Sequence, residues 1–147
     1  MDHERWMREA LALADEAARA GEVPVGCVVV RGEEILGRGR NRREEERSAL
    51  AHAELDAIRE ACRALGDWRL SSCGLYVTLE PCPMCAGAIL NARIPAVIYG
   101  AREEKTGSLG SVVDLFSENY GFHPRVYGGV LRAECAALLR AFFEEKR

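Results

Sequence analysis

Hydrophobic and polar positions repeat along the chain with two different periods, and together these periods predict alternating helices and strands. Near the N-terminus, Trp6, Ala10 and Leu13 recur at helical spacing and would form one apolar face. Residues 23–30 and 75–79 are instead nearly continuous apolar runs rich in β-branched side chains, which is typical of buried strands. The pattern therefore predicts both element types within one chain.

Applied to the whole chain, the pattern predicts helices at residues 1–20, 51–64, 81–92 and 132–146. It predicts strands at residues 23–30, 35–39, 75–79, 96–99 and 125–127. The Gly/Ser-rich residues 105–113 are expected to be loop, and the charged residues 42–47 a solvent-exposed loop. Strands that alternate with helices predict an α/β fold, in which helices are layered around one sheet.

Composition and charge narrow the class of protein. The 147 residues fit one domain spanning residues 1–147, and 48% of them are hydrophobic, enough for one core. No apolar run approaches the ~18–20 residues of a membrane span, and the first residues lack the apolar core of a secretory signal. We therefore expect a cytoplasmic protein with no membrane partner. Because the net charge is −3, any RNA contact would need a local basic patch and a shaped pocket.

Two short segments carry the candidate chemistry, one at residues 51–54 (Ala-His-Ala-Glu) and one at residues 80–85 (Glu-Pro-Cys-Pro-Met-Cys). Pro81 suits the first turn of a helix, where its missing N–H is not needed. Cys82 and Cys85 are three positions apart, so their sulfurs would lie on one face of adjacent turns. The positive end of the helix dipole also favours thiolates there.

The first segment can complete a metal site with the second. His52 lies at the start of a predicted helix and can supply an imidazole nitrogen to the ion held by Cys82 and Cys85. Three protein ligands leave one position of a tetrahedral zinc ion open for water, as in catalytic rather than structural sites. Glu54, two residues after His52, can project beside the metal and act as the catalytic proton shuttle. We therefore expect one zinc ion per chain.

Other interpretations of the cysteines remain open at this point. A redox pair at Cys82 and Cys85 would give His52 and Glu54 no role. A structural zinc site would need a fourth ligand, for which the candidates are Cys27, Cys62, Cys73 and Cys135. These four are more simply interpreted as small buried side chains. The combination H-x-E followed by P-C-x-x-C is the known signature of zinc nucleobase deaminases, which favours the catalytic interpretation.

The similarity to a known family extends over nearly the whole chain. The segments that carry it are Glu22-Val23-Pro24-Val25-Gly26, Asn41, and residues 51–54, 75–88, 91–95, 99–101, 105–107 and 134–143. Together they resemble the bacterial tRNA adenosine deaminases, and the stretch around Cys82 and Cys85 is highly specific.

The resemblance implies a cytidine deaminase-like, three-layer α/β fold, in which helices cover both faces of a five-stranded mixed sheet. It implies a homodimer that converts adenosine to inosine at the wobble position of a tRNA anticodon, chiefly in an arginine tRNA. The anticodon loop would then be the partner. It further implies that Asn41 hydrogen-bonds the flipped base, that Val25 belongs to the segment lining the base pocket, and that Glu103 approaches a ribose 2′-hydroxyl.

Two functional alternatives stay open. The chain could be a deaminase of free nucleobases or nucleosides, of the guanine or cytosine type, because those enzymes share the metal motif. It could also be a non-catalytic, zinc-stabilised RNA-binding module, which would have no use for Glu54. Basic residues near the C-terminus (Arg140, Lys146 and Arg147) favour RNA, although a helix dipole alone also favours a basic helix end.

Overall fold

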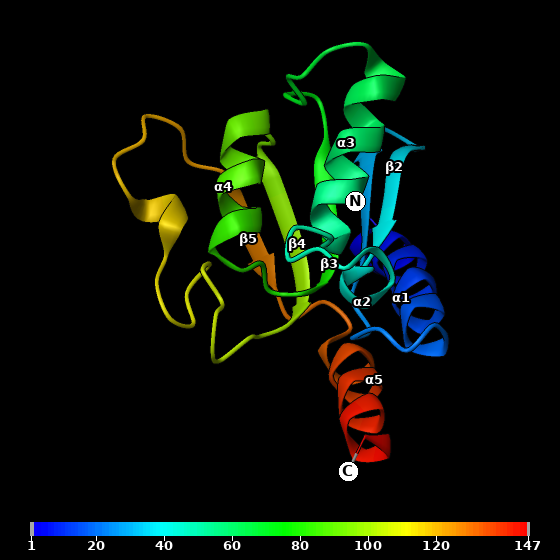
Figure 1. Cartoon of the computed structure of the whole chain (residues 1–147). Coiled ribbons are helices and arrows are strands. Elements are labelled where there is room, and N and C mark those ends of the chain that lie inside the picture. The colour runs from blue at the N-terminus through cyan, green and yellow to red at the C-terminus, as the bar shows by residue number, and fades with distance from the viewer. Residues whose placement is uncertain (1, 147) are drawn as a thin grey trace.

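A five-stranded mixed sheet forms the centre of the chain in the computed structural model, which describes residues 2–146 (Figure 1). The strands are β1 (Gly26–Arg31), β2 (Glu34–Arg40), β3 (Gly74–Leu79), β4 (Ala96–Ala101) and β5 (Arg125–Gly128). Their order in the sheet is β2-β1-β3-β4-β5. β1 is antiparallel to β2 and β3, whereas β3, β4 and β5 are parallel to one another.

Helices cover both faces of this sheet. They are α1 (His3–Arg19), α2 (Arg43–Glu46), α3 (Ala53–Leu65), α4 (Pro83–Ala92) and α5 (Arg132–Glu145), with one 3-10 turn at Leu115–Ser117. In Figure 1, α3 and α4 lie on the near face of the sheet and α1 lies behind it. The three-layer α/β fold and the five-stranded mixed sheet expected from the sequence are thus confirmed.

The alternation of side chains along β1 explains the two layers. Cys27 and Val29 face the core formed with α3 and α4, whereas Val28 and Val30 face the core formed with α1 and α5. All four side chains are buried because a central strand covered by helices on both faces has no solvent side. This explains why residues 23–30 form a continuous apolar run instead of an alternating one.

Two glycines of β2 allow α3 to lie close against the sheet. A Cβ atom at Gly37 would collide with the carbonyl oxygen of Ala57, and one at Gly39 with that of Ala53. The backbone of the helix therefore touches the backbone of the strand at these points. Because Ala53 is the first residue of α3, this contact also fixes the position of His52, which precedes it.

The boundaries of several predicted elements are corrected: the helix predicted from residue 51 begins at Ala53, and the strand predicted to end at residue 99 ends at Ala101. The predicted strand at 23–30 begins only at Gly26, because Pro24 has no N–H for a strand ladder and the N–H of Val25 donates to Val23 within a tight turn. The helix predicted from Pro81 begins at Pro83. Cys82 is extended and forms the N-cap, since a residue that precedes proline is disfavoured in the helical region.

Residues 42–47 are also not the simple loop that we expected. Arg43–Glu46 forms the helical turn α2, and its side chains are exposed as predicted. The buried carboxylate of Glu22 accepts hydrogen bonds from the N–H groups of Glu44 (3.1 Å) and Glu45 (2.8 Å). This distant acceptor satisfies the N–H groups at the start of the turn and explains why it is helical.

The structure describes residues up to one position from each end of the chain. Met1, where the first helix was predicted to begin, and Arg147 lie outside the described residues. Among residues 2–146, none of the helices has the length and apolar character that crossing a lipid bilayer requires.

Candidate metal centre and substrate cavity

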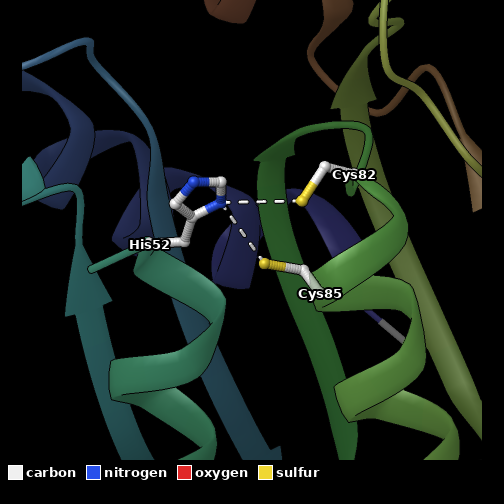
Figure 2. Close-up of side chains that lie close together, drawn as sticks. All are labelled: His52, Cys82 and Cys85. Carbon is white, nitrogen blue, oxygen red and sulfur yellow. Dashed lines mark hydrogen bonds between the residues drawn. The ribbon is translucent and has the colours of Figure 1, made fainter. Parts of the chain in front are cut away.

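His52, Cys82 and Cys85 meet where α3 and α4 begin (Figure 2). His52 is the N-cap of α3, Cys82 is the N-cap of α4, and Cys85 lies in the first turn of α4. Nδ1 of His52 lies 3.7 Å from Sγ of Cys82 and 3.5 Å from Sγ of Cys85. The three candidate ligand atoms all lie within 4.8 Å of one another. The structure thus brings together the three residues that the sequence analysis proposed as metal ligands.

These distances suit a zinc ion. With a Zn–S bond of about 2.3 Å and a Zn–N bond of about 2.0 Å at the tetrahedral angle, sulfur and nitrogen lie roughly 3.5 Å apart. The observed distances of 3.5 and 3.7 Å agree with that value. Two cysteine sulfurs and an imidazole nitrogen are also a donor set that zinc prefers. The residues present thus fit the metal that the motif implies.

The ionisation of the Cys82 thiol agrees with this role. A hydrogen bond with Cys85 lowers the pKa of the Cys82 thiol to about 4, and the same interaction raises the pKa of Cys85. The hydrogen bond with Cys82 also raises the pKa of His52. A thiolate is the form of cysteine that binds metals, so Cys82 is already in its ligating form.

The other four cysteines do not join this group within residues 2–146. Cys27, Cys73 and Cys135 are buried in the two cores. Cys62 is half-buried, and its thiol donates to the carbonyl oxygen of Trp68. The described residues therefore supply three ligands and no cysteine for a fourth, which is the arrangement of a site open to water or substrate.

Glu54 lies in the first turn of α3 and lines a cavity of about 130 Å³ together with His52 and Cys82. Its side chain is only 4% exposed. Burial raises the pKa of the Glu54 carboxyl to about 7. A carboxyl group with such a pKa exchanges protons readily near neutral pH, as a general acid–base group must.

The three residues implied by the family resemblance line the same cavity. Val25 and Asn41 are buried, and Glu103 is half-buried. The Asn41 side chain also has structural contacts, because Nδ2 donates to the carbonyl oxygen of Val23 (3.2 Å) and Oδ1 accepts from the N–H of Ala53 (3.2 Å). Asn41 thus holds together the turn before β1 and the start of α3, on which His52 and Glu54 depend.

Sequence reasoning assigned no role to Arg43, Glu80 or Thr106, which also line the cavity. Arg43 comes from the turn α2. Glu80 precedes the metal-binding segment, and its buried carboxylate accepts several hydrogen bonds from residues 103–111. Burial acts to raise the pKa of Glu80, but the hydrogen bonds from Ser111, Leu109 and Glu103 together hold it below its usual value. The only feature of the sequence that could have indicated a role for Glu80 was its position next to Pro81 and Cys82.

A second hollow of about 370 Å³ adjoins the cavity. The two share Val23, Asn41 and Arg43, and the second one continues to the end of α5. There it is lined by Phe142, Phe143 and Lys146. The concave surface is therefore longer than the cavity beside the metal ligands, and its outer part offers aromatic rings and a cation.

The fold, the Cys₂His group that could hold a metal ion and the buried glutamate beside it are the features of the nucleobase deaminase class. A family model of MafB19-like deaminases matches residues 1–147. The tRNA-specific adenosine deaminase of Bacillus subtilis is 48% identical over 145 residues, which are 98% of this chain and 90% of that protein. The chain belongs to this deaminase family and, within it, to the tRNA-specific adenosine deaminases.

The chain also resembles part of a larger protein. It is 54% identical over 142 residues to the tRNA(Ile)-lysidine synthase of Deinococcus radiodurans, which corresponds to 96% of this chain but spans only 24% of that protein.

Solved structures of deaminases superpose on this chain. One from a study of A-to-I editing by tRNA:A34 deaminases at the wobble position superposes with a TM-score of 0.88 at 45% identity, over 92% of this chain and 99% of the other. Guanine deaminase from Bacillus subtilis superposes less well, with a TM-score of 0.66 at 44% identity, over 69% of this chain and 66% of the other.

Proposed function

We propose that the chain is one deaminase domain that hydrolyses adenosine to inosine at the wobble position of a tRNA anticodon, chiefly an arginine tRNA. The tRNA-specific adenosine deaminase of Bacillus subtilis and the structure from the study of tRNA:A34 deaminases support this assignment. The observation that carries the proposal is the cavity that holds Glu54 beside the Cys₂His group and opens into a second hollow.

His52, Cys82 and Cys85 would hold one zinc ion per chain. When bound, zinc supplies a Lewis acid that makes water nucleophilic near neutral pH. Glu54 accepts the proton of the attacking water and delivers a proton to N1 of the adenine ring. Once the oxygen has bonded to C6, Glu54 accepts the second proton of that oxygen and transfers it to the amino group as the C6–N6 bond breaks, which leaves a carbonyl at C6. Ammonia leaves, and the base becomes hypoxanthine.

The substrate base would lie among Val25, Asn41 and Glu103 in the cavity. Val25 offers an apolar surface to the ring. The Nδ2 group of Asn41 has two hydrogens and uses one for Val23, so the second can be donated to the base. Glu103 would accept a hydrogen bond from the ribose 2′-hydroxyl, which favours RNA over DNA.

The adjoining hollow supports a substrate larger than one nucleoside. Single-stranded RNA is recognised by bases that stack on aromatic side chains and by cations near the phosphates. Phe143, 52% exposed, and Lys146 offer these groups at the end of the hollow, and Arg43 lies where the two cavities meet. Such a local arrangement suits a chain whose net charge of −3 gives no general attraction to RNA.

The enzyme would act in the cytoplasm, where tRNA is processed, and as a homodimer. Met84 and Ala88 of α4 are half-buried and available for an interface, whereas Ile89 of the same helix is fully buried in the core of one chain. A light-scattering mass that matches one 16.2 kDa chain at micromolar concentration would contradict the dimer.

A substrate comparison tests the proposed function directly. We expect ammonia release from an anticodon stem-loop with adenosine at the wobble position, and little from free adenosine, adenine, cytidine or guanine. A free nucleoside lacks the flanking nucleotides of the stem-loop. The contacts of those nucleotides with the protein would also align the reacting base. Efficient turnover of a free base, with none on the stem-loop, would instead identify a nucleobase deaminase of the guanine or cytosine type.

A further inference from the structure

One part of the cavity wall is a loop, residues 102–114, that is attached to one buried carboxylate. Two residues of this loop, Glu103 and Thr106, line the cavity. The loop contains no helix or strand, and only its bridge between Leu109 and Asp114 resembles sheet structure. Something other than regular structure must therefore hold Glu103 and Thr106 in place.

Glu80 supplies that attachment. Its carboxylate accepts hydrogen bonds from the N–H groups of Glu103 (3.1 Å), Leu109 (2.9 Å) and Ser111 (3.1 Å), and from the Ser111 hydroxyl. Glu80 is 2% exposed, so these bonds are shielded from water. Hydrogen bonds to an ionised, buried acceptor are the strong ones in proteins. One side chain thus joins both ends of the loop.

The fit between the loop and Glu80 is close. A Cβ atom at Gly107 would lie 2.6 Å from Oε1 of Glu80, and it would also collide with the carbonyl oxygen of Glu103. The N–H of Ser108 donates to the carbonyl oxygen of Pro81 (2.9 Å). The loop is therefore fastened to the Glu80-Pro81 dipeptide, which leads directly into the ligand Cys82.

We infer that Glu80 is a positioning residue that sets the Glu103–Thr106 wall of the substrate cavity relative to the metal ligands. Glu80 connects the two because its backbone leads to Cys82 and its side chain holds the loop. Its contribution is to substrate affinity and alignment and does not require it to touch the reacting atoms. The inference deepens the proposed function and rests on it only for the choice of substrate.

The test is Glu80→Gln in the zinc-loaded enzyme. Gln is isosteric, but its amide group presents N–H where the loop also presents N–H, so at least one accepted hydrogen bond is lost. We expect hydrogen exchange at the amides of Glu103, Leu109 and Ser111 to accelerate by about tenfold. We expect KM for the stem-loop to rise by about tenfold, with a smaller fall in kcat and an unchanged zinc content.

Two serine variants calibrate the effect. Ser111→Ala removes the hydroxyl that donates to Glu80, together with its exposed hydrogen bond from Nε of Arg102, and should raise exchange and KM by about threefold. Ser117→Ala removes a hydroxyl that donates to the carbonyl oxygen of Asp114, away from Glu80, and should change neither. Glu80→Asp keeps the charge and should recover part of the loss.

Unchanged exchange at the three amides in Glu80→Gln would overturn the inference, as would loss of zinc, which would assign Glu80 to the metal site. A fall in kcat with KM unaltered would also contradict it. The exchange measurement needs no substrate. If the wild-type enzyme proved to act on a free base, the proposed function would fail, while the exchange result would still decide the role of Glu80, and KM would be measured with that base.

Discussion

Glu54 and Glu80 are two carboxylates of the same cavity, 4% and 2% exposed, whose surroundings shift their pKa values in opposite directions. Burial raises the pKa of Glu54 to about 7. Burial also acts on Glu80, but the hydrogen bonds from Ser111, Leu109 and Glu103 together hold its pKa low. One of these carboxyl groups can therefore exchange a proton near neutral pH, whereas the other stays ionised.

The same residue type can thus serve two roles within a single site. A carboxylate surrounded by N–H donors is fixed in charge and position, so it can hold a loop. A carboxyl group with few such donors has no strong preference for either protonation state near neutral pH, so it can transfer protons. Substitutions that separate chemistry from positioning can test this contrast.

Loss of the metal should have the largest effect. It should abolish the chemistry in which Glu54 takes part and leave the loop attached to Glu80 unchanged. In Cys85→Ala we expect the zinc content to fall from about one per chain to near zero, because two protein ligands hold zinc poorly. Activity should be lost with it, while the loop held by Glu80 should keep its slow amide exchange. Metal analysis and hydrogen exchange of the same sample measure both.

Cys62→Ala is the matched control, because Cys62 is half-buried on α3 and lies outside the Cys₂His group. It should retain zinc and activity. Full zinc and full activity in Cys85→Ala would disprove the assignment of the metal site.

The next largest effect should come from Glu54→Gln, which keeps the shape of the side chain and removes its ability to accept a proton. General acid–base groups contribute about 10²–10⁴ in rate, so kcat should fall by roughly that factor. Zinc content, thermal stability and affinity for the stem-loop should remain close to those of the wild type. Single-turnover deamination and RNA binding are the measurements.

Glu60→Gln controls for a general effect on α3. Glu60 lies on the same helix, and its carboxylate accepts only from the N–H of Arg38 at an exposed position. Its turnover should match that of the wild type. A Glu54→Gln enzyme that turns over normally would show that another group moves the proton, whereas one that lost zinc would favour the non-catalytic module.

How far the sequence could predict this site depends on the range of the contacts involved. His52, Cys82 and Cys85 were predictable because their side-chain chemistry and spacing are local signals. The fold class was predictable because buried strands and amphipathic helices each have their own hydrophobic period. Even the extended N-cap at Cys82 follows from Pro83, although the helix was predicted to begin earlier.

Contacts between distant segments were predictable only where motifs mark both partners, as for His52 and the two cysteines, which are 30 and 33 positions apart. Glu22 reaches the turn α2, which is more than 20 positions away, and Glu80 reaches Leu109 and Ser111, which are 29 and 31 positions away. No local pattern marks a carboxylate as the acceptor of remote backbone N–H groups. Arg43 was therefore assigned to a solvated loop, and the role of Glu80 was missed despite its place in a recognised motif.

The smallest effect, and the sharpest test of how closely Glu80 and its loop fit, comes from a pair of Gly→Ala variants. At Gly107 the added methyl group would meet Glu80 and the carbonyl oxygen of Glu103. Overpacking of this kind costs about 1–3 kcal/mol of unfolding free energy.

Gly87 in α4 is the matched position with free space. Apart from the neighbouring residues and the backbone of the helix itself, no atom lies within 4 Å of a methyl group added there. Alanine there should stabilise the protein by about 0.4–1 kcal/mol, because it restricts the unfolded chain. Urea denaturation of the zinc-loaded proteins should therefore shift the two midpoints in opposite directions. If Gly107→Ala were as stable as the wild type, the loop would have room beside Glu80. The contrast between a rigidly held Glu80 and a proton-exchanging Glu54 would then lose its structural basis.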